Sequence, residues 1–151
     1  TTSPTGAASG VALTTQPVVK VVDVSGNPVS GTTVTASVTT GSGTLANATA
    51  TTDGSGTATF SGLTITGSVG SYTLKFTAGS ASVSATAFTL TSGAASTLTI
   101  STQPAGAVNG VALTTPPAIT VTDASSNPVA NVTVTASIAS GWSRVLDDDD
   151  A

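Results

Sequence analysis

Short stretches in which apolar and polar residues alternate recur along this chain. The alternation covers residues 19–22, 34–39, 57–60 with 63 and 65, 72–76 and 83–88. Successive side chains of a β-strand point to opposite faces, so a period of two predicts strands with one buried face. Turn-forming residues lie between these stretches, among them Ser25-Gly26-Asn27-Pro28, Asp53-Gly54-Ser55-Gly56 and Ala78-Gly79-Ser80. No stretch has a helical period of helical length, so we expect seven short strands in an antiparallel β-sandwich.

The inward positions of these strands supply the predicted core. The segment around Lys20 recurs 100 residues later in the chain, with Thr120 in place of Lys20. This replacement of a charged by a polar residue indicates that Lys20 points outward and its neighbours inward. Tyr72, in a late strand, is predicted either to form a tyrosine corner, in which its hydroxyl binds a neighbouring loop, or simply to pack in the core. The predicted core residues are Val19, Val21, Val34, Phe60, Tyr72, Leu74, Phe76 and Phe88.

The chain repeats itself at an offset of 100 residues. Gly10-Val11-Ala12-Leu13-Thr14-Thr15 recurs as Gly110-Val111-Ala112-Leu113-Thr114-Thr115, and between Gly10 and Gly41 there are 19 identities in 32 positions without a gap. A period of about 100 residues is the size of one small domain. The 151 residues therefore predict about one and a half tandem repeats.

The composition excludes most catalytic chemistry. Thr and Ser number 32 and 21, whereas His, Cys, Met and Glu are absent. Without His, Glu or Cys the usual acid, base, thiolate and zinc-binding groups are missing, so we expect no enzyme, no cofactor and no metal site. Asp23, Asn27, Asp53 and Asp123 lie one or two to a turn, too few for Ca²⁺, and are predicted to bond the local backbone instead.

The charge distribution argues against nucleic-acid and membrane partners. Three Lys and Arg residues stand against seven Asp, a net charge of −4, and the basic residues are scattered along the chain. Nucleic-acid binding needs a concentrated basic patch, which three scattered residues do not form. No apolar run approaches the roughly 18 residues of a membrane helix. We therefore predict neither nucleic-acid binding nor membrane insertion.

Two strings of the first repeat carry a family resemblance. Val21-Val22-Asp23-Val24-Ser25-Gly26-Asn27-Pro28-Val29-Ser30-Gly31 and Thr51-Thr52-Asp53-Gly54-Ser55-Gly56-Thr57-Ala58, followed by Gly70-Ser71-Tyr72-Thr73-Leu74, resemble bacterial Ig-like repeats of the invasin/intimin (Big-1) type. The resemblance covers residues 1–141. It implies an Ig-like sandwich in a bacterial extracellular or cell-surface protein, used as a stalk or adhesive module, with an unidentified host or cell-surface ligand.

The repeat boundaries predict three regions. Residues 1–93 are expected to form an Ig-like domain without its first strand, because nothing ahead of Thr1 corresponds to the alternating segment Ser96–Ile100. Residues 94–141 correspond to the first half of a second Ig-like repeat, and residues 142–151 form an Asp-rich tail outside the repeat. The half repeat at residues 94–141 is too small to close a sandwich alone, since chains below about 60 residues are marginal even with a full core.

An incomplete repeat leaves unpaired strand edges, which favour pairing with another chain or with a neighbouring repeat. Thr97, Leu98, Thr99 and Ile100 are the predicted strand-exchange interface. The first hypothesis is a structural subunit of a bacterial surface filament, a homo-oligomer completed by donor-strand exchange. The alternative is a stalk or spacer repeat of a long cell-surface adhesin, held together by neighbouring repeats.

Overall fold

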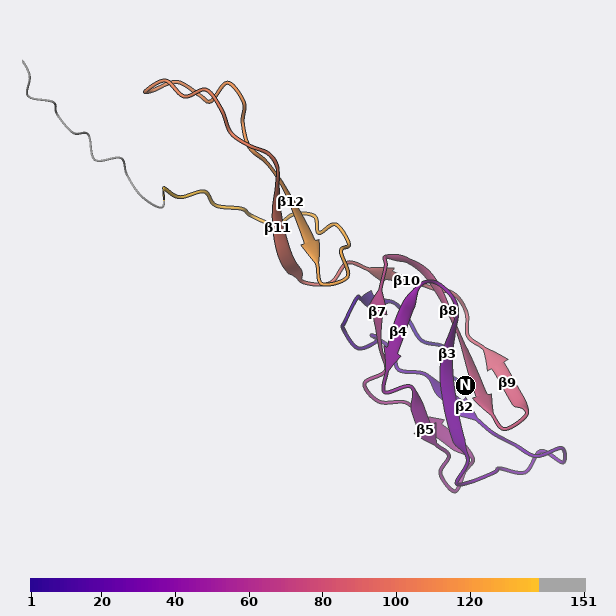
Figure 1. Ribbon diagram of the computed structural model, residues 1–151. Coiled ribbons are helices and arrows are strands. Elements are labelled where there is room, and N and C mark those ends of the chain that lie inside the picture. Colours follow the sequence, from indigo (N-terminus) through magenta and orange to yellow (C-terminus); the bar gives the residue numbers. More distant parts are fainter. Residues whose placement is uncertain (139–151) are drawn as a thin grey trace, which may run out of the picture.

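A computed structural model describes residues 1–138, and within them the chain is all β, with no helix. Figure 1 shows a sandwich at one end of an elongated molecule and a two-stranded hairpin, β11 and β12, that continues away from it. The sandwich is formed by the first repeat and the hairpin by the second. The end of the predicted region 94–141, from residue 139 onward, and the whole of the predicted tail 142–151 lie outside the described residues.

One layer of the sandwich is a six-stranded sheet. Its order is β1-β10-β8-β3-β5, and β9 pairs with the same central strand β8. All of its pairs are antiparallel except β1 with β10. The strands are β1 (Ala7–Ala8), β3 (Thr33–Thr40), β5 (Thr49–Thr51), β8 (Gly70–Ala78), β9 (Ala81–Ser84) and β10 (Phe88–Thr91).

The opposing layer consists of two short antiparallel ladders. β2 (Val18–Lys20) pairs with β6 (Thr57–Thr59), and β4 (Gly43–Ala46) pairs with β7 (Thr64–Gly67). Strands β1, β4 and β5 were not expected from the sequence. They are two to four residues long and carry at most one large apolar side chain, so their alternation gives almost no signal.

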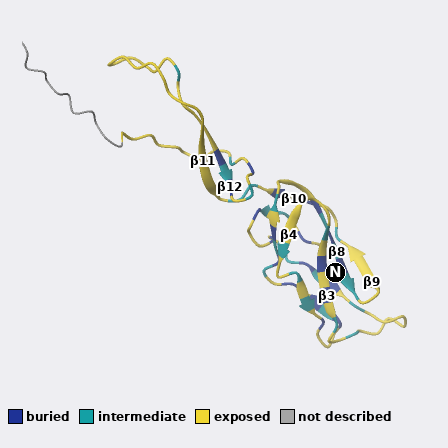
Figure 2. Ribbon diagram, in the orientation of Figure 1, coloured by how far each residue is buried: buried dark blue, intermediate teal, exposed yellow. Residues whose placement is uncertain are grey.

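The core between the two layers contains the predicted residues. Seven of the eight are buried, and Val21 is half-buried and packs against the same cluster. Lys20, between Val19 and Val21, is exposed as predicted. Leu13, Leu63, Ile65 and Leu90 are buried with them, and Figure 2 shows that buried residues gather in the sandwich while the hairpin is mostly exposed. The antiparallel β-sandwich is thus confirmed for the first repeat.

Two aromatic pairs lie inside this core. Phe60, which follows β6, meets Phe76 of β8 across the sandwich, with ring centroids 5.2 Å apart and planes tilted by 57°. Tyr72 stacks near Phe88 at 6.4 Å. The Tyr72 hydroxyl lies 2.6 Å from the Ser42 carbonyl oxygen and 2.9 Å from that of Ser68, four residues upstream. Tyr72 therefore both packs in the core and binds a loop, which confirms the tyrosine corner.

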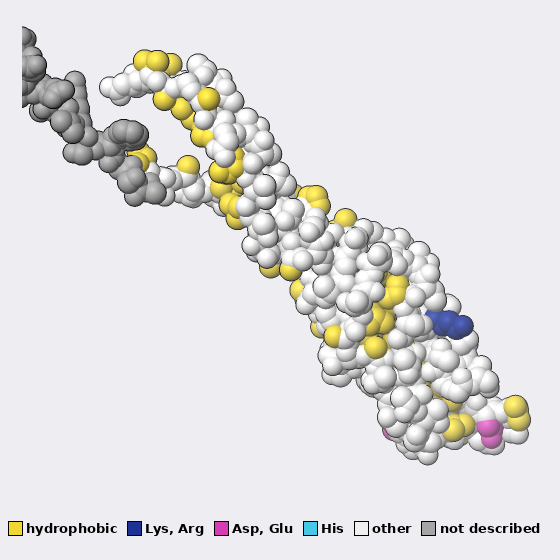
Figure 3. Space-filling view, viewed as in Figure 1, with side chains coloured by type: hydrophobic (Ala, Val, Ile, Leu, Met, Phe, Trp, Pro, Cys, Tyr) yellow, Lys and Arg dark blue, Asp and Glu magenta, His cyan; other side chains and the backbone are white. Residues whose placement is uncertain are grey.

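The second repeat forms only a hairpin within the described residues. β11 (Ala95–Thr102) pairs antiparallel with β12 (Ala118–Asp123), with Leu98 opposite Val121 and Ile100 opposite Ile119. Leu113, Ile119 and Val134 are 38%, 39% and 39% exposed, whereas their equivalents Leu13, Val19 and Val34 are 3%, 6% and 0% exposed. On the face in view, Figure 3 shows hydrophobic side chains spread along this part of the chain. These three positions are buried only in the first repeat, where a second sheet covers them.

Residues 133–137 show the same dependence on neighbours. Their sequence is identical to that of residues 33–37, which lie in β3 between β5 and β8, yet they form no strand in the structure. The part of the second repeat that the structure describes offers no equivalent of β5 or β8 for them to pair with. Local pattern alone is therefore insufficient to form this strand.

We expect Phe60→Ala to lower the free energy of unfolding by about 3–5 kcal/mol, because it removes the buried ring that bridges the two layers. Urea unfolding followed by Tyr72 fluorescence measures the loss. Val24→Ala is the matched control, since Val24 is fully exposed at 107%, and such surface changes alter stability by at most about 0.5 kcal/mol. Equal effects of the two substitutions would contradict the assigned core.

Candidate functional site

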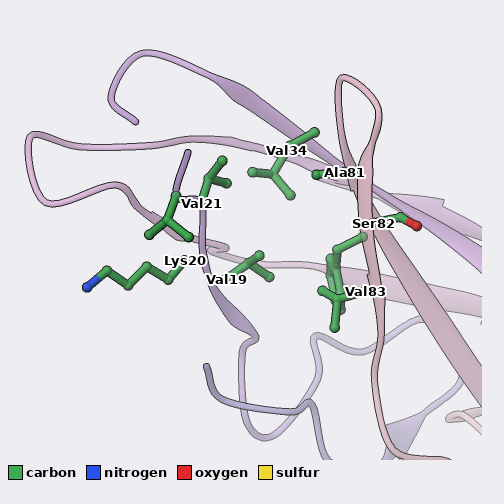
Figure 4. A pocket seen from close by; sticks show the side chains of 10 residues that line it. Val19, Lys20, Val21, Val34, Ala81, Ser82 and Val83 are labelled. Atoms are coloured by element: carbon green, nitrogen blue, oxygen red, sulfur yellow. The ribbon is translucent and has the colours of Figure 1, made fainter. Parts of the chain in front are cut away.

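Two features of the sandwich are candidate sites: a groove along β2 and a contact with the second repeat at the opposite end. The groove has a volume of about 180 Å³ and lies between β2 and β9. Val19, Val21, Val34, Phe76 and Val83 line it. Figure 4 shows the valines around the groove and the Lys20 side chain directed away from it. The groove is thus an apolar channel beside a strand edge.

The strand edge along this groove is almost unpaired. On one side β2 pairs with β6, with Val19 opposite Ala58. On the other side the described residues provide a single bridge, from Thr2 to Val18. The equivalent pair in the second repeat, Thr102 with Ala118, is where the β11–β12 ladder begins. A strand added to β2 in that register would put its equivalents of Ile100 and Leu98 opposite Val19 and Val21.

The four residues predicted for strand exchange do form one strand. Thr97, Leu98, Thr99 and Ile100 lie in β11, paired with residues 119–122 of β12. Leu98 and Ile100 are 58% and 51% exposed, so the hairpin covers only part of their surface. The structure places them beyond the end of the sandwich and does not bring them to the groove along β2 (Figure 1).

At the far end of the sandwich the turn after β12 contacts the first repeat. The Asn127 side chain donates to the Gly67 carbonyl oxygen at 2.9 Å and accepts from the Val69 amide at 2.9 Å. The Gly93 amide donates to the Asp123 carboxylate at 2.7 Å, and the hydroxyls of Ser9 and Ser125 are 3.1 Å apart. Ser9 also bonds Gly67. We call the surface formed by Ser9, Gly67, Val69 and Gly93 the end face.

This contact is buried and fully hydrogen-bonded. Asp123 and Asn127 are each 4% exposed, and Ser9 is 8% exposed. Among the described residues no buried side-chain polar atom lacks a hydrogen-bond partner. Each neutral hydrogen bond of Asn127 stabilises the contact by about 0.5–1.5 kcal/mol, and the loss of one partner would leave the other group buried without a bond. The contact therefore fixes the hairpin to the sandwich.

The Asp residues of the turns have the predicted local role. The Asp123 carboxylate accepts from the amides of Ser125 and Asn127 and from the Asn127 side chain. The bond from the Asn127 side chain is the main reason that the pKa of Asp123 falls from 3.8 to about 2; the bonds from the amides of Gly93, Asn127 and Ser125 lower it further, while burial opposes them. Hydrogen bonds from Asn27 and from Ser55 likewise lower the pKa of Asp23 and of Asp53.

The sequence interpretation missed the contact of the second turn. It assigned Asp123 to bonding the local backbone and gave Asn127 no role, and local bonding explains the Asp of this turn. It does not explain Asn at the fifth position, because the similar turn at Asp53 has Thr57 there. The recurrence of Asn at residues 27 and 127 was the available signal. Within the described residues no group of three His, Cys, Asp or Glu side chains converges as a metal site would require.

The comparisons with known proteins bear on the first repeat. Residues 2–92 match the family model described as SMCHD1 Ig-like domain 6, which agrees with the Ig-like sandwich expected from the strand pattern. Searches of the curated proteins and of the solved structures gave no match. No helix in residues 1–138 is both long enough and apolar enough to cross a membrane.

The lowered pKa of Asp123 gives the contact a defined pH dependence. The stabilisation is complete above the unfolded value of 3.8 and is lost as the pH falls through the folded value of about 2, because protonation removes the charged acceptor. A carbon-13 NMR titration of the carboxyl groups should find Asp123 near 2 in the native chain. Asn127→Ala should raise this pKa towards 3.8, since it removes the largest cause of the shift.

The matched control for this titration is Asn27→Ala. It should raise the pKa of Asp23, whose lowered value also depends first on its Asn partner, and leave Asp123 unchanged. An Asp123 pKa near 3.8 in the native chain would show that the turn is not hydrogen-bonded as described.

Proposed function

The chain belongs to the Ig-like family described as SMCHD1 Ig-like domain 6, and from that premise we propose that it is a non-enzymatic spacer module in which Ig-like repeats follow one another in a stiff tandem array. The observation that supports this most directly is the buried contact of Asp123 and Asn127 with the end face, which joins one repeat to the next.

The connection between the repeats supports the same function. Three residues, Ser92 to Ala94, separate the last strand of the sandwich from the first strand of the second repeat. A linker this short and a hydrogen-bonded turn restrict the angle between the repeats at two points, which a spacer needs and a flexible hinge does not. As part of the proposal we keep the finer resemblance to bacterial invasin/intimin (Big-1) repeats and with it an extracellular or cell-surface, adhesin-like setting.

Residual dipolar couplings of the full chain test whether the two repeats move together. We expect the couplings of residues 2–92 and of the β11–β12 hairpin to fit one alignment tensor, because the end-face contact fixes their relative orientation. Asp123→Ala with Asn127→Ala should require two tensors. The matched control is Asp23→Ala with Asn27→Ala. It alters the equivalent turn of the first repeat, which lies away from the contact, so one alignment tensor should still fit. Two tensors in the native chain would refute the stiff array.

Strand exchange between chains is a second candidate, favoured by the groove along β2. The groove is apolar, its strand edge is nearly unpaired, and β11 carries the exposed side chains of Leu98 and Ile100. Transfer of β11 from β12 to β2 of another copy would bury both side chains, at about 25 cal/mol for each Å² of apolar surface removed from water. One-way, head-to-tail pairing of this kind gives open filaments wherever the rotation between copies does not close a ring.

Size-exclusion chromatography of the full chain at micromolar concentrations tests this candidate. Strand exchange predicts a series of oligomers that Leu98→Asp with Ile100→Asp converts to monomer. Val108→Asp with Val111→Asp is the matched control, because these valines are 69% and 64% exposed but lie outside β11. A native chain that stays monomeric throughout the concentration range would exclude strand exchange.

A further inference from the structure

The turn after β2 is a copy of the turn that contacts the end face. In the second repeat the amides of Ser125 and Asn127 donate to the Asp123 carboxylate at 2.8 and 2.9 Å, and the Asn127 side chain donates at 2.9 Å. In the first repeat the corresponding bonds to Asp23 measure 2.8, 2.8 and 3.0 Å. The two turns therefore have the same shape, and the shape of the first does not depend on a contact.

The two turns differ in what covers them. Asp123 and Asn127 are buried against the end face, whereas Asp23 and Asn27 are exposed. The turn after β2 lies at the other end of the sandwich from the end face (Figure 1). The first repeat thus has a turn at one end and an end face at the other, the arrangement that allows head-to-tail stacking.

Asn27 provides the groups that the end face binds. The end face offers a carbonyl oxygen at Gly67 and an amide at Val69, and an Asn side chain satisfies both at once. The nearby turn at Asp53 has the same backbone bonds, at 2.9 and 3.0 Å, but carries Thr57 in place of Asn and has no such amide. At position 24 the first repeat has Val where the second has Ala, and Ala124 is exposed in the second repeat.

We propose that the turn from Asp23 to Asn27 is a docking element that binds the end face of another copy of this Ig-like repeat, through Ser9, Gly67, Val69 and Gly93 of that copy. The inference rests on the proposed tandem array and extends it: a complete repeat both offers a turn and receives one. It also assigns Asn27 as the residue that gives the junction its specificity.

A chain in which residues 1–100 precede residues 1–151 tests the proposal. The join keeps the repeat in register, because residue 101 aligns with residue 1. With nitrogen-15 asparagine, the side-chain amide of Asn27 in the second copy should shift towards the resonance of Asn127 and exchange with water as slowly. Asn27 in the first copy should keep the shift and rate that it has in the single chain.

Two variants of the second copy serve as controls. Asn27→Ala should remove only the shifted signal. Asn27→Thr reproduces the turn at Asp53, so it should preserve the turn yet still expose the Val69 amide of the first copy to exchange. Identical signals from both copies of Asn27, with Asn127 protected, would overturn this inference alone. Loss of protection at Asn127 in the same spectrum would instead refute the tandem array on which the inference rests.

Discussion

This fold depends on closing one thin apolar layer between two sheets. Most of the side chains are small, with Thr and Ser together making up 53 of the 151 residues, so a few large groups carry the packing. Phe60 and Phe76 meet across the layer, and Tyr72 attaches the sheet that contains it to the neighbouring loops. Where both sheets are present, the surrounding valines and leucines are buried. Where one is absent from the described residues, Leu113, Ile119 and Val134 at the equivalent positions are exposed.

The two repeats act as an internal comparison of sequence and context. Residues 33–37 form a strand and the identical residues 133–137 do not, because only the first set has neighbouring strands. The turns at residues 23–27 and 123–127 behave in the opposite way, since both keep one shape through their own hydrogen bonds. Strands in this molecule require partners, whereas these turns are preformed. A preformed turn loses little conformational freedom on docking, which suits it to join successive units.

The sequence was sufficient for the sandwich but not for the junction. Alternation located the long strands, the outward Lys20 and the predicted core residues, of which Val21 is only half-buried. It succeeded because a strand buried on one face has apolar residues at every second position of its sequence. Strands β1, β4 and β5 are too short and too polar to leave that signal. The roles of Asp123 and Asn127 at the end face were missed because one motif both shapes a turn and binds a neighbour, and only the first role is local. The lining of the groove along β2 by Val83 of β9 was not predictable either, because it depends on long-range packing.

Hydrogen exchange of the Val69 and Gly93 amides in the full chain tests the central claim most directly. Both amides donate to side chains of the second repeat, Val69 to Asn127 and Gly93 to Asp123. If the turn binds the end face in solution, both amides will be protected at neutral pH, and the substitutions Asp123→Ala and Asn127→Ala will abolish that protection while the amides of β3 and β8 stay protected. Exchange of Val69 and Gly93 at the rate of an open chain in the native protein would show that the repeats are not joined in this way.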